Sequence, residues 1–248
     1  MILKHLGHSR KKEHGFTLVE LLVAMAMTAV VMTAVYTLYK SQQDTYIAQD
    51  QVVEMQQNLR ASFYQMARDL RMAGFNPQRS PAVGGFTDTK LEGDGNDETK
   101  TTSTHIAFYI DQNANGDVDA NDDEQIAYRF DAANDRLEKF SVTTDTWQTV
   151  ADNISAVDFV YLDPGGTDIT NAVIATPTVL YASTNLPYID SIRSIELSIV
   201  ARAGRIDRSF PGTPAYLNQQ DAPILAAQSD NYRKRLITTT IFCRNLGL

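Results

Sequence analysis

Cysteine and histidine are scarce in this chain, and their scarcity limits its chemistry. Among 248 residues there is one cysteine, Cys243, so no disulfide can form within the chain. Three of the four histidines lie within the first 14 residues, which leaves His105 as the only histidine of the remaining sequence. One histidine and one cysteine do not make a zinc site, which needs several protein ligands. No nucleophile or acid–base partner stands at a recognisable spacing from His105, so we expect the protein not to be an enzyme.

Positive charge is also in short supply. The chain has 22 lysines and arginines against 30 aspartates and glutamates, a formal net charge of −8. Four of the basic residues, Lys4, Arg10, Lys11 and Lys12, lie close to the N-terminus. Loss of residues 1–15 would leave 18 basic and 29 acidic residues, a net charge of −11. Such a charge disfavours binding to phosphates, so we expect no direct contact with nucleic acid.

One stretch of the chain, Phe16–Tyr39, lacks charge except for Glu20. Its roughly 24 residues would span about 36 Å as a helix, which is enough to cross a bilayer once. The basic residues before it favour a cytoplasmic N-terminus, so the C-terminal bulk of the chain would be exported. Residues 16–39 are therefore predicted to form a transmembrane segment. A carboxylate in such a segment costs about 2.5–3.5 kcal/mol on insertion scales, so Glu20 calls for a functional explanation.

The run GFTLVELLVAMAMTAVV, which begins at Gly15, resembles the signal of type IV prepilins. The resemblance implies that a dedicated prepilin peptidase cuts between Gly15 and Phe16, methylates the new N-terminal amine of Phe16, and leaves Glu20 as the fifth mature residue. Residues 1–15 would then be a leader peptide. Two other interpretations are a secretory signal cleaved after Ala26 and a plain single-pass anchor. The spacing of Gly15, Phe16 and Glu20 favours the prepilin signal.

Glu20 gains a candidate partner if the chain is cut before Phe16. The new positive amine lies four residues before the carboxylate, about one helical turn away. In an apolar filament core, that amine and the Glu20 carboxylate of a neighbouring subunit can neutralise each other. Removing one partner of a buried ion pair costs about 3–5 kcal/mol, enough to fix the axial register between subunits. The alternatives are an ion pair within one subunit and an interfacial charge that is merely tolerated.

After Tyr39 the sequence becomes amphipathic. Apolar residues recur at intervals of three and four, the spacing of one helical stripe, at Val52, Met55, Leu59, Phe63, Met66 and Leu70. Gly74 and Pro77 supply a stop signal, so the helix is predicted to run from Phe16 to Gly74, about 59 residues and roughly 89 Å. We expect residues 40–75 to form its amphipathic half and to pack on a sheet of the same chain.

The remaining residues, 76–248, are predicted to form a β-rich globular head. Residues 76–104 are typical of a long surface connection, and the proline-bearing segment Ala203–Tyr232 is typical of a surface lid or contact loop. Short apolar runs indicate strands at His105–Ile110, Gln125–Phe130, Ile154–Leu162, Thr178–Ala182, Ser194–Ala201 and Leu236–Cys243. These patterns predict an α+β fold in which a long N-terminal helical spine packs on an antiparallel sheet, as the pilin resemblance also implies.

One loop suggests inorganic chemistry. It matches an EF-hand loop in several places, with oxygen side chains at positions 1, 3 and 5, Gly116 at 6 and the apolar Val118 at 8. The candidate Ca²⁺ ligands are Asp111, Asn113, Asn115, Asp117, Asp119 and Asp122. The twelfth position is Asp rather than the bidentate Glu, and the flanks resemble strands, which disfavours a calcium sensor. If the loop binds Ca²⁺, a dissociation constant of order 10⁻⁴–10⁻³ M is expected; the alternative is a solvated hairpin loop rich in Asx turns.

Features beyond the leader narrow the resemblance to PilW-type minor pilins. They are the large head, the run Asp123–Arg129 after the Asp/Asn loop, and the ending from Tyr232 through Thr238-Thr239-Thr240 to Leu246. The chain has no C-terminal cysteine pair, and Thr37 stands where the family's helix-bending proline usually occurs. Both departures favour a minor over a major pilin.

This resemblance implies a non-catalytic subunit at the filament tip that primes pilus assembly and supports adhesion, twitching motility or DNA uptake. Its partners would be the prepilin peptidase, other minor and major pilins, the pilus assembly platform and a tip adhesin. It would lie in the inner membrane with a periplasmic head before assembly, and in the pilus at the cell surface afterwards. Two alternatives stay open: a minor pseudopilin of a type II secretion system, similar to GspJ, and a membrane-tethered, calcium-dependent module that binds a surface through Ala203–Tyr232.

Two smaller features concern the terminal strand. The run Arg233-Lys234-Arg235 is isolated in an acidic region, and a solvated entry to the strand is favoured over contact with an acidic neighbouring subunit. For Cys243, a buried thiol is favoured over an intermolecular bridge, because cysteine commonly behaves as a small apolar residue.

Overall fold

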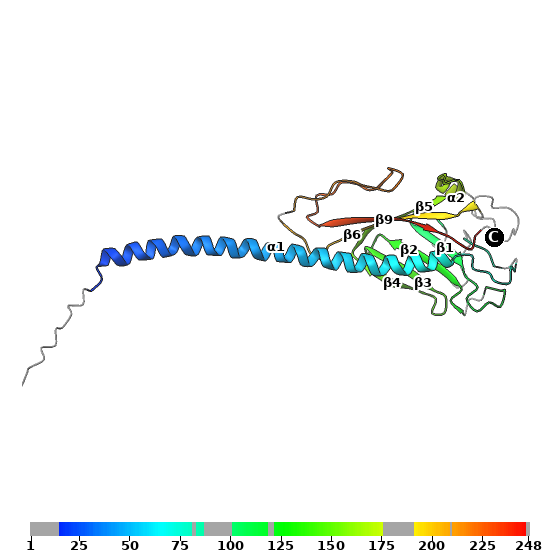
Figure 1. The fold of residues 1–248 in the computed structure, drawn as a ribbon, viewed down its shortest axis with the longest axis horizontal. Coiled ribbons are helices and arrows are strands. Elements are labelled where there is room, and N and C mark those ends of the chain that lie inside the picture. Colours follow the sequence, from blue (N-terminus) through cyan, green and yellow to red (C-terminus); the bar gives the residue numbers. More distant parts are fainter. Residues whose placement is uncertain are drawn as a thin grey trace, which may run out of the picture. The chain divides into compact units, whose positions relative to one another are not determined.

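The computed structural model describes residues 15–80, 83–86, 101–118, 122–175, 191–208 and 210–246. The chain divides into two compact units, Met1–Gln49 and Asp50–Leu248. Of the predicted leader, only Gly15 belongs to the described residues. Helix α1 (Leu18–Met72) begins in the first unit and continues into the second (Figure 1).

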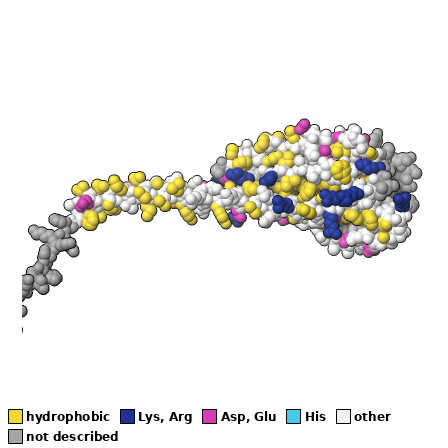
Figure 2. All heavy atoms as spheres, viewed as in Figure 1, with side chains coloured by type: hydrophobic (Ala, Val, Ile, Leu, Met, Phe, Trp, Pro, Cys, Tyr) yellow, Lys and Arg dark blue, Asp and Glu magenta, His cyan; other side chains and the backbone are white. Residues whose placement is uncertain are grey.

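The described part of the first unit, residues 15–49, is helical from Leu18 onward, and its side chains up to Tyr39 are mostly apolar. Its large hydrophobic side chains between Phe16 and Ile47 are exposed, and Figure 2 shows hydrophobic side chains along much of this part of the helix, with other side chains between them. By length and composition α1 is able to cross a membrane. The hydroxyls of Thr28, Thr33 and Thr37 donate hydrogen bonds of 2.7–2.8 Å to backbone carbonyl oxygens one turn earlier. These polar side chains are thus satisfied by their own helix.

In the second unit, α1 presents the predicted stripe to a core. Met55, Leu59, Met66 and Leu70 are buried, whereas Val53 on the opposite side is exposed. Apolar residues at intervals of three and four fall on one face of a helix, which is why a single stripe enters the core. The amphipathic character predicted after Tyr39 is therefore confirmed for this part of the helix.

The C-terminal end of α1 lies at Met72, two residues before the predicted end. Gly74 has a φ of 72°, a left-handed conformation that glycine adopts without a steric penalty. Its N–H donates a hydrogen bond of 2.9 Å to the carbonyl oxygen of Tyr109. This contact ties the end of the helix to the first strand.

Two larger antiparallel sheets and a small hairpin form the rest of the second unit. The first sheet has the order β1-β2-β3-β4 and the second has the order β5-β6-β9, while β7 and β8 pair with each other. The bounds are β1 (His105–Tyr109), β2 (Gln125–Asp131), β3 (Arg136–Ser141), β4 (Thr146–Asp152), β5 (Ile154–Leu162), α2 (Thr170–Ala175), β6 (Ser194–Arg202), β7 (Tyr216–Leu217), β8 (Pro223–Leu225) and β9 (Lys234–Phe242).

Backbone hydrogen bonds join the two sheets into one layer. The N–H of Phe159 on β5 donates to the carbonyl oxygen of Ser103, just before β1, at 2.8 Å. The N–H of Ile154 donates to the carbonyl oxygen of Asp135 at 2.9 Å. β5 therefore borders the entry to β1, and β4 and β9 form the two outer edges of the layer on either side of α1 (Figure 1).

One apolar cluster fills the space between α1 and both sheets. It joins Leu59 and Leu70 of the helix to Tyr128 of the first sheet and to Phe159 and Leu197 of the second. Full burial of one such side chain contributes about 1.5–3 kcal/mol. The helix and both sheets therefore share a single core.

The α+β class and the antiparallel pairing agree with the sequence prediction, although the head contains two main sheets instead of one. Strands β3 and β4 did not follow from the sequence pattern, because their apolar residues are few and interrupted by charged or polar ones. The segment Ala203–Tyr232 contains the β7–β8 hairpin rather than loop alone. The strand expected at Thr178–Ala182 lies outside the described residues.

Candidate functional site

The N-terminal site comprises Gly15, Phe16, Thr17 and Glu20, at the beginning of α1. Phe16 is 88% exposed, so the Gly15–Phe16 peptide bond is not protected by packing within the described residues. The helix begins at Leu18, two residues after Phe16. The bond at which cleavage is predicted thus lies in the exposed, non-helical segment that precedes the helix.

Thr17 and Glu20 form a reciprocal capping box. The Glu20 carboxylate accepts hydrogen bonds from the Thr17 backbone N–H at 3.0 Å and from the Thr17 hydroxyl at 3.1 Å. The Glu20 N–H donates in return to the Thr17 hydroxyl oxygen at 3.3 Å. Each side chain satisfies a backbone donor that the first helical turn leaves unpaired. The sequence signal for this role, Thr-x-x-Glu before an apolar run, is present but was not part of the sequence prediction.

The candidate calcium loop connects β1 to β2 and folds around Asp111. The Asp111 side chain is buried, and its two oxygens accept hydrogen bonds of 3.0 Å from the N–H groups of Asn115 and Gly116. The side-chain oxygen of Asn113 also accepts from the Asn115 N–H, at 2.8 Å. The Asn113 amide donates to the Asp122 carboxylate at 2.7 Å, which closes the loop.

Glu124 holds the base of this loop, a role that the sequence analysis missed. Its buried carboxylate accepts hydrogen bonds from the backbone N–H groups of Gln112 at 2.9 Å and Asn113 at 3.2 Å. Among the described residues, no group of three His, Cys, Asp or Glu side chains is placed to hold a metal ion, and the candidate ligand Asp119 lies outside them. Ca²⁺ binding at the loop therefore stays a prediction.

Two family models match the chain. The model described as prepilin peptidase-dependent protein B covers residues 48–209, and the model of the prokaryotic N-terminal methylation motif covers residues 10–36. The chain belongs to the prepilin peptidase-dependent protein B family. A similar solved structure is a type IV-like pilin from Thermus thermophilus, with 13% identity, a TM-score of 0.44, and coverage of 77% of this chain and 97% of that one. No curated protein matches the chain.

The family and the methylation motif agree with the predicted type IV pilin-like class. The motif contains Gly15, Phe16 and Glu20, and the family model begins in α1 and extends past β6. Both describe pilin-type structural subunits rather than enzymes. The chain is thus a type IV pilin-like protein with an N-methylation motif.

The predicted contact segment, Ala203–Tyr232, is anchored to the outer face of the second sheet. The Asn218 amide donates to the Asp158 carboxylate at 2.8 Å, and the Gln220 amide donates to the Glu196 carboxylate at 2.9 Å. Burial raises the pKa of Asp158, although its hydrogen bond from Asn218 acts in the opposite direction. These contacts give the hairpin a defined position on the sheet.

The basic run before β9 differs from the solvated entry expected from the sequence. Lys234 pairs with Asp230, and its side chain is only 1% exposed. Arg233 pairs with Asp207 at 2.8 Å. The charges of Lys234 and Arg233 are both neutralised because the segment before β9 places Asp230 and Asp207 next to them. Arg235 alone is exposed and makes no ion pair among the described residues.

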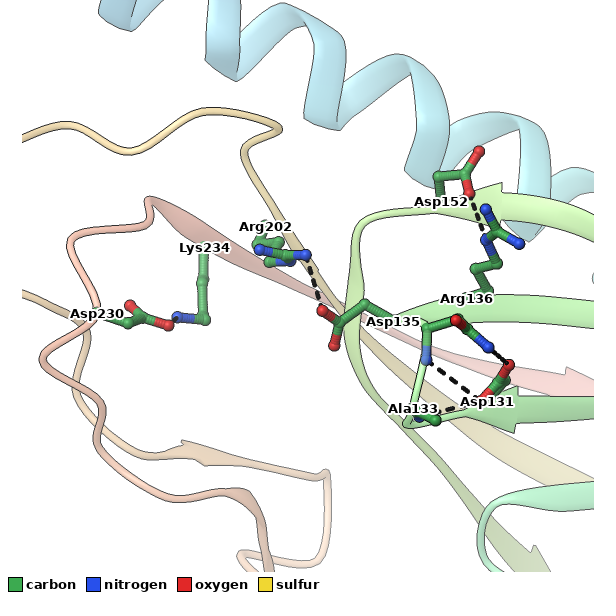
Figure 3. A network of polar contacts seen from close by, with 9 residues as sticks. Asp131, Ala133, Asp135, Arg136, Asp152, Arg202, Asp230 and Lys234 are labelled. Carbon is green, nitrogen blue, oxygen red and sulfur yellow. Dashed lines mark hydrogen bonds and ion pairs between the residues drawn. The ribbon is translucent and has the colours of Figure 1, made fainter.

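Two neighbouring ion pairs lie where the end of β6 approaches the turns of the first sheet, as Figure 3 shows. Arg202, at the end of β6, contacts Asp135 in the β2–β3 turn at 2.7 Å. Arg136 contacts Asp152 across β3 and β4 at 2.9 Å, with both side chains about half exposed. The first pair links the two sheets, whereas the second is a surface pair of small energetic value.

Cys243 and His105 do not form a reactive pair. Cys243 is buried directly after β9, and burial raises the pKa of its thiol to about 12, so the thiol stays protonated at neutral pH. The ring Nδ1 of His105 lies 2.9 Å from the Thr104 hydroxyl. The prediction that Cys243 is a buried thiol is confirmed.

Proposed function

We propose that this protein is a minor type IV pilin of the PilW type, a non-catalytic subunit that primes pilus assembly. The observation that carries the proposal is the combination, in one chain, of an N-methylation motif, an exposed apolar helix and a large antiparallel head. Among the described residues of the first unit, 15–49, the helix has no apolar partner, as expected of a segment that is surrounded by lipid and then by other helices. Adhesion, twitching motility or DNA uptake would follow from the assembled filament.

The proposed maturation begins in the inner membrane. A prepilin peptidase would cut between Gly15 and Phe16 and methylate Phe16, in keeping with the description of the family. The head would lie in the periplasm, and the assembly platform would move the subunit into a filament with other minor and major pilins and a tip adhesin. In the filament, Glu20 would neutralise the Phe16 amine of a neighbouring subunit.

The experiment that tests this maturation is N-terminal mass analysis of the protein isolated from sheared filaments. The expected species begins at Phe16 and carries one additional methyl group. An intact Met1, or a chain that begins after Ala26, would contradict the proposal. The same measurement on membranes of a strain without the prepilin peptidase provides the control, because the leader should remain attached there.

The nearest alternative is a minor pseudopilin of a type II secretion system. Such a protein would share the N-terminal motif, the helix and the type of head, so the two proposals differ in the filament rather than in the chain. The neighbouring genes discriminate between them, since each system encodes its own ATPase and secretin.

We also retain the proposal that the loop between β1 and β2 binds Ca²⁺. In its support, Asp111 and Glu124 already hold the loop backbone in a closed turn, which leaves the remaining oxygen side chains near the outside. A calcium-dependent, membrane-tethered module that binds a surface through Ala203–Tyr232 would need this site. Calorimetric titration of the detergent-solubilised full chain with millimolar Ca²⁺ tests it, with Asp111→Asn as the matched variant; a silent titration would remove the proposal.

A further inference from the structure

The two main sheets have four edges, and among the described residues two of these edges are covered and two are open. On β1, the N–H of Tyr109 donates to the carbonyl oxygen of Gly85 at 3.0 Å. On β5, the N–H of Phe159 donates to Ser103 at 2.8 Å. Among the described residues, by contrast, β4 pairs only with β3, and β9 pairs only with β6. Open edges offer unpaired N–H and C=O groups to another strand, so proteins usually cover them or use them.

The outer edge of β9 is long and regular. β9 pairs with β6 over nine residues without a bulge. Two hydrogen bonds give the orientation of its backbone: Cys243 N–H to the Arg193 carbonyl oxygen at 2.9 Å, and Ala203 N–H to the Arg233 carbonyl oxygen at 2.8 Å. Because backbone groups alternate along an antiparallel strand, the odd-numbered residues face β6. The outward donors and acceptors therefore belong to Leu236, Thr238, Thr240 and Phe242.

The two open edges carry opposite charges at their ends. Arg244 follows β9 and Asp145 precedes β4, and both are exposed and form no ion pair among the described residues. Arg235, at the other end of the β9 edge, is also exposed. Figure 2 shows several basic side chains on the face that contains α1 and β9. A strand that approaches β9 would thus be favoured by an acidic end.

Exposed polar side chains on both edges suit a cross-strand contact. Thr238 is exposed on β9, and Thr146, Gln148 and Thr149 are exposed on β4. If Arg244 lies beside Asp145, an antiparallel register brings Thr240 opposite Thr149, and opposed threonines are among the side-chain pairs that stabilise antiparallel strands. A bulge in the β3–β4 pairing follows Thr149, so the regular part of β4 is its first four residues, next to Asp145.

We propose that the β9 edge of one copy pairs with the β4 edge of a second copy, antiparallel, with Arg244 beside the second copy's Asp145. The contact is heterologous, because it joins two different surfaces of the same chain. A pair of copies joined in this way still has one free β9 edge and one free β4 edge, so a third copy can bind at either end. The inference goes beyond the proposed function and does not depend on it, since it concerns which strands join two copies in any filament system.

Cysteine cross-linking in membranes tests the contact with the full chain. Two tagged copies are expressed together, one carrying Thr240→Cys and the other carrying Gln148→Cys or Thr149→Cys. Oxidation should link the two tags, whereas the same Thr240→Cys copy with Asp221→Cys in the β7–β8 turn should give no link. The native Cys243 does not interfere, because it is buried with a raised pKa. Absence of a link from both β4 positions would overturn the proposal.

Two further variants identify the cause of the link. Arg244→Asp should lower the linked fraction by about two- to fivefold, and Asp145→Arg in the partner copy should restore it, as expected for an exposed ion pair whose sign is exchanged. Phe242→Pro removes an outward N–H inside the paired stretch and should abolish the link, whereas Phe242→Leu should preserve it. Restoration by charge exchange excludes a folding defect as the cause. Unchanged linking in both Arg244→Asp and Phe242→Pro would overturn the strand pairing.

Discussion

Glu20 takes part in two interactions that single substitutions can separate. It closes a capping box with Thr17, and in our proposal it also neutralises the amine of a neighbouring subunit. Gln at this position can still complete a capping box, whereas it carries no charge. Replacing Thr17 has the opposite effect, because the carboxylate remains while its hydroxyl partner is lost.

We therefore predict different outcomes for the two variants. Glu20→Gln should insert into the membrane normally but fail to enter filaments, whereas Thr17→Val should weaken the first helical turn by about 1 kcal/mol and still be incorporated. Immunoblots of sheared filaments and of membranes measure both outcomes. Normal incorporation of Glu20→Gln would refute the role of the charge, and equal defects in both variants would assign the effect to capping.

Asp69 on α1 is the second residue with a testable effect, since it receives two hydrogen bonds from the first sheet. Its carboxylate lies 2.7 Å from the Tyr128 hydroxyl and 2.8 Å from the Lys139 ammonium. Asp69→Ala should lower the free energy of unfolding by about 2–3 kcal/mol, because it leaves a buried hydroxyl and a partly buried cation without an acceptor. Denaturant titration of the solubilised full chain measures the loss. Asp152→Ala, which breaks the surface pair with Arg136, is the control and should cost below about 1 kcal/mol.

At the scale of elements, the two faces of α1 in the second unit should respond differently to truncation. Leu59 is fully buried and Val53 is half exposed. Leu59→Ala removes buried methyl groups and leaves a cavity, so it should destabilise the head by about 3 kcal/mol, whereas Val53→Ala should change stability by below about 0.5 kcal/mol. Thermal unfolding of both variants measures the contrast. Equal effects would show that the helix is not seated on the core as described.

The β7–β8 hairpin gives a prediction that depends on pH. Because burial raises the pKa of Asp158, the folded state holds this proton more tightly than the unfolded state, so the residue's contribution to stability decreases as pH rises above about 4. Asp158→Asn keeps an acceptor for Asn218 and removes the partly buried charge. The variant should gain stability relative to the native chain at pH 7 and lose that advantage near pH 3. Asp221→Asn, in the exposed turn of the same hairpin, is the control; a constant difference across pH would contradict the prediction.

The elements also show how far the sequence could be interpreted. The stripe from Met55 to Leu70 determined the packing of α1, since a helix with one apolar face has one way to bury it. β5 was recognisable as a mostly apolar run, and β6 by the alternation of Ile195, Leu197 and Ile199 with polar residues. β3 and β4 were missed because partners, rather than intrinsic preference, stabilise such short polar strands. The capping box at Thr17 could have been predicted from the Thr-x-x-Glu pattern. The role of Glu124 could not, because it depends on the fold that brings the backbone N–H groups of Gln112 and Asn113 to one carboxylate.

At the scale of the whole molecule, the proposed pilus role and the secretion alternative predict different consequences of losing the chain. If it is a minor pilin, deletion should remove surface filaments and leave export through any type II secretion system unchanged. Electron microscopy of the cell surface and assay of secreted proteins measure the two outcomes. Complementation with the native chain is the control. Intact filaments together with impaired secretion would favour the pseudopilin.

The threonine hydroxyls of α1 bear on how easily the helix can pass from lipid to contact with other helices. Thr28, Thr33 and Thr37 donate to their own backbone and therefore seek no acceptor outside the helix. In hydrocarbon, a free hydroxyl would need a partner, and leaving that partner would cost energy. Helix α1 can exchange lipid chains for the side chains of other helices without breaking any of these bonds. Extraction from a bilayer would then be governed by the contacts of its apolar surface and by the charge of Glu20, and the threonine hydroxyls would add no barrier to the transfer.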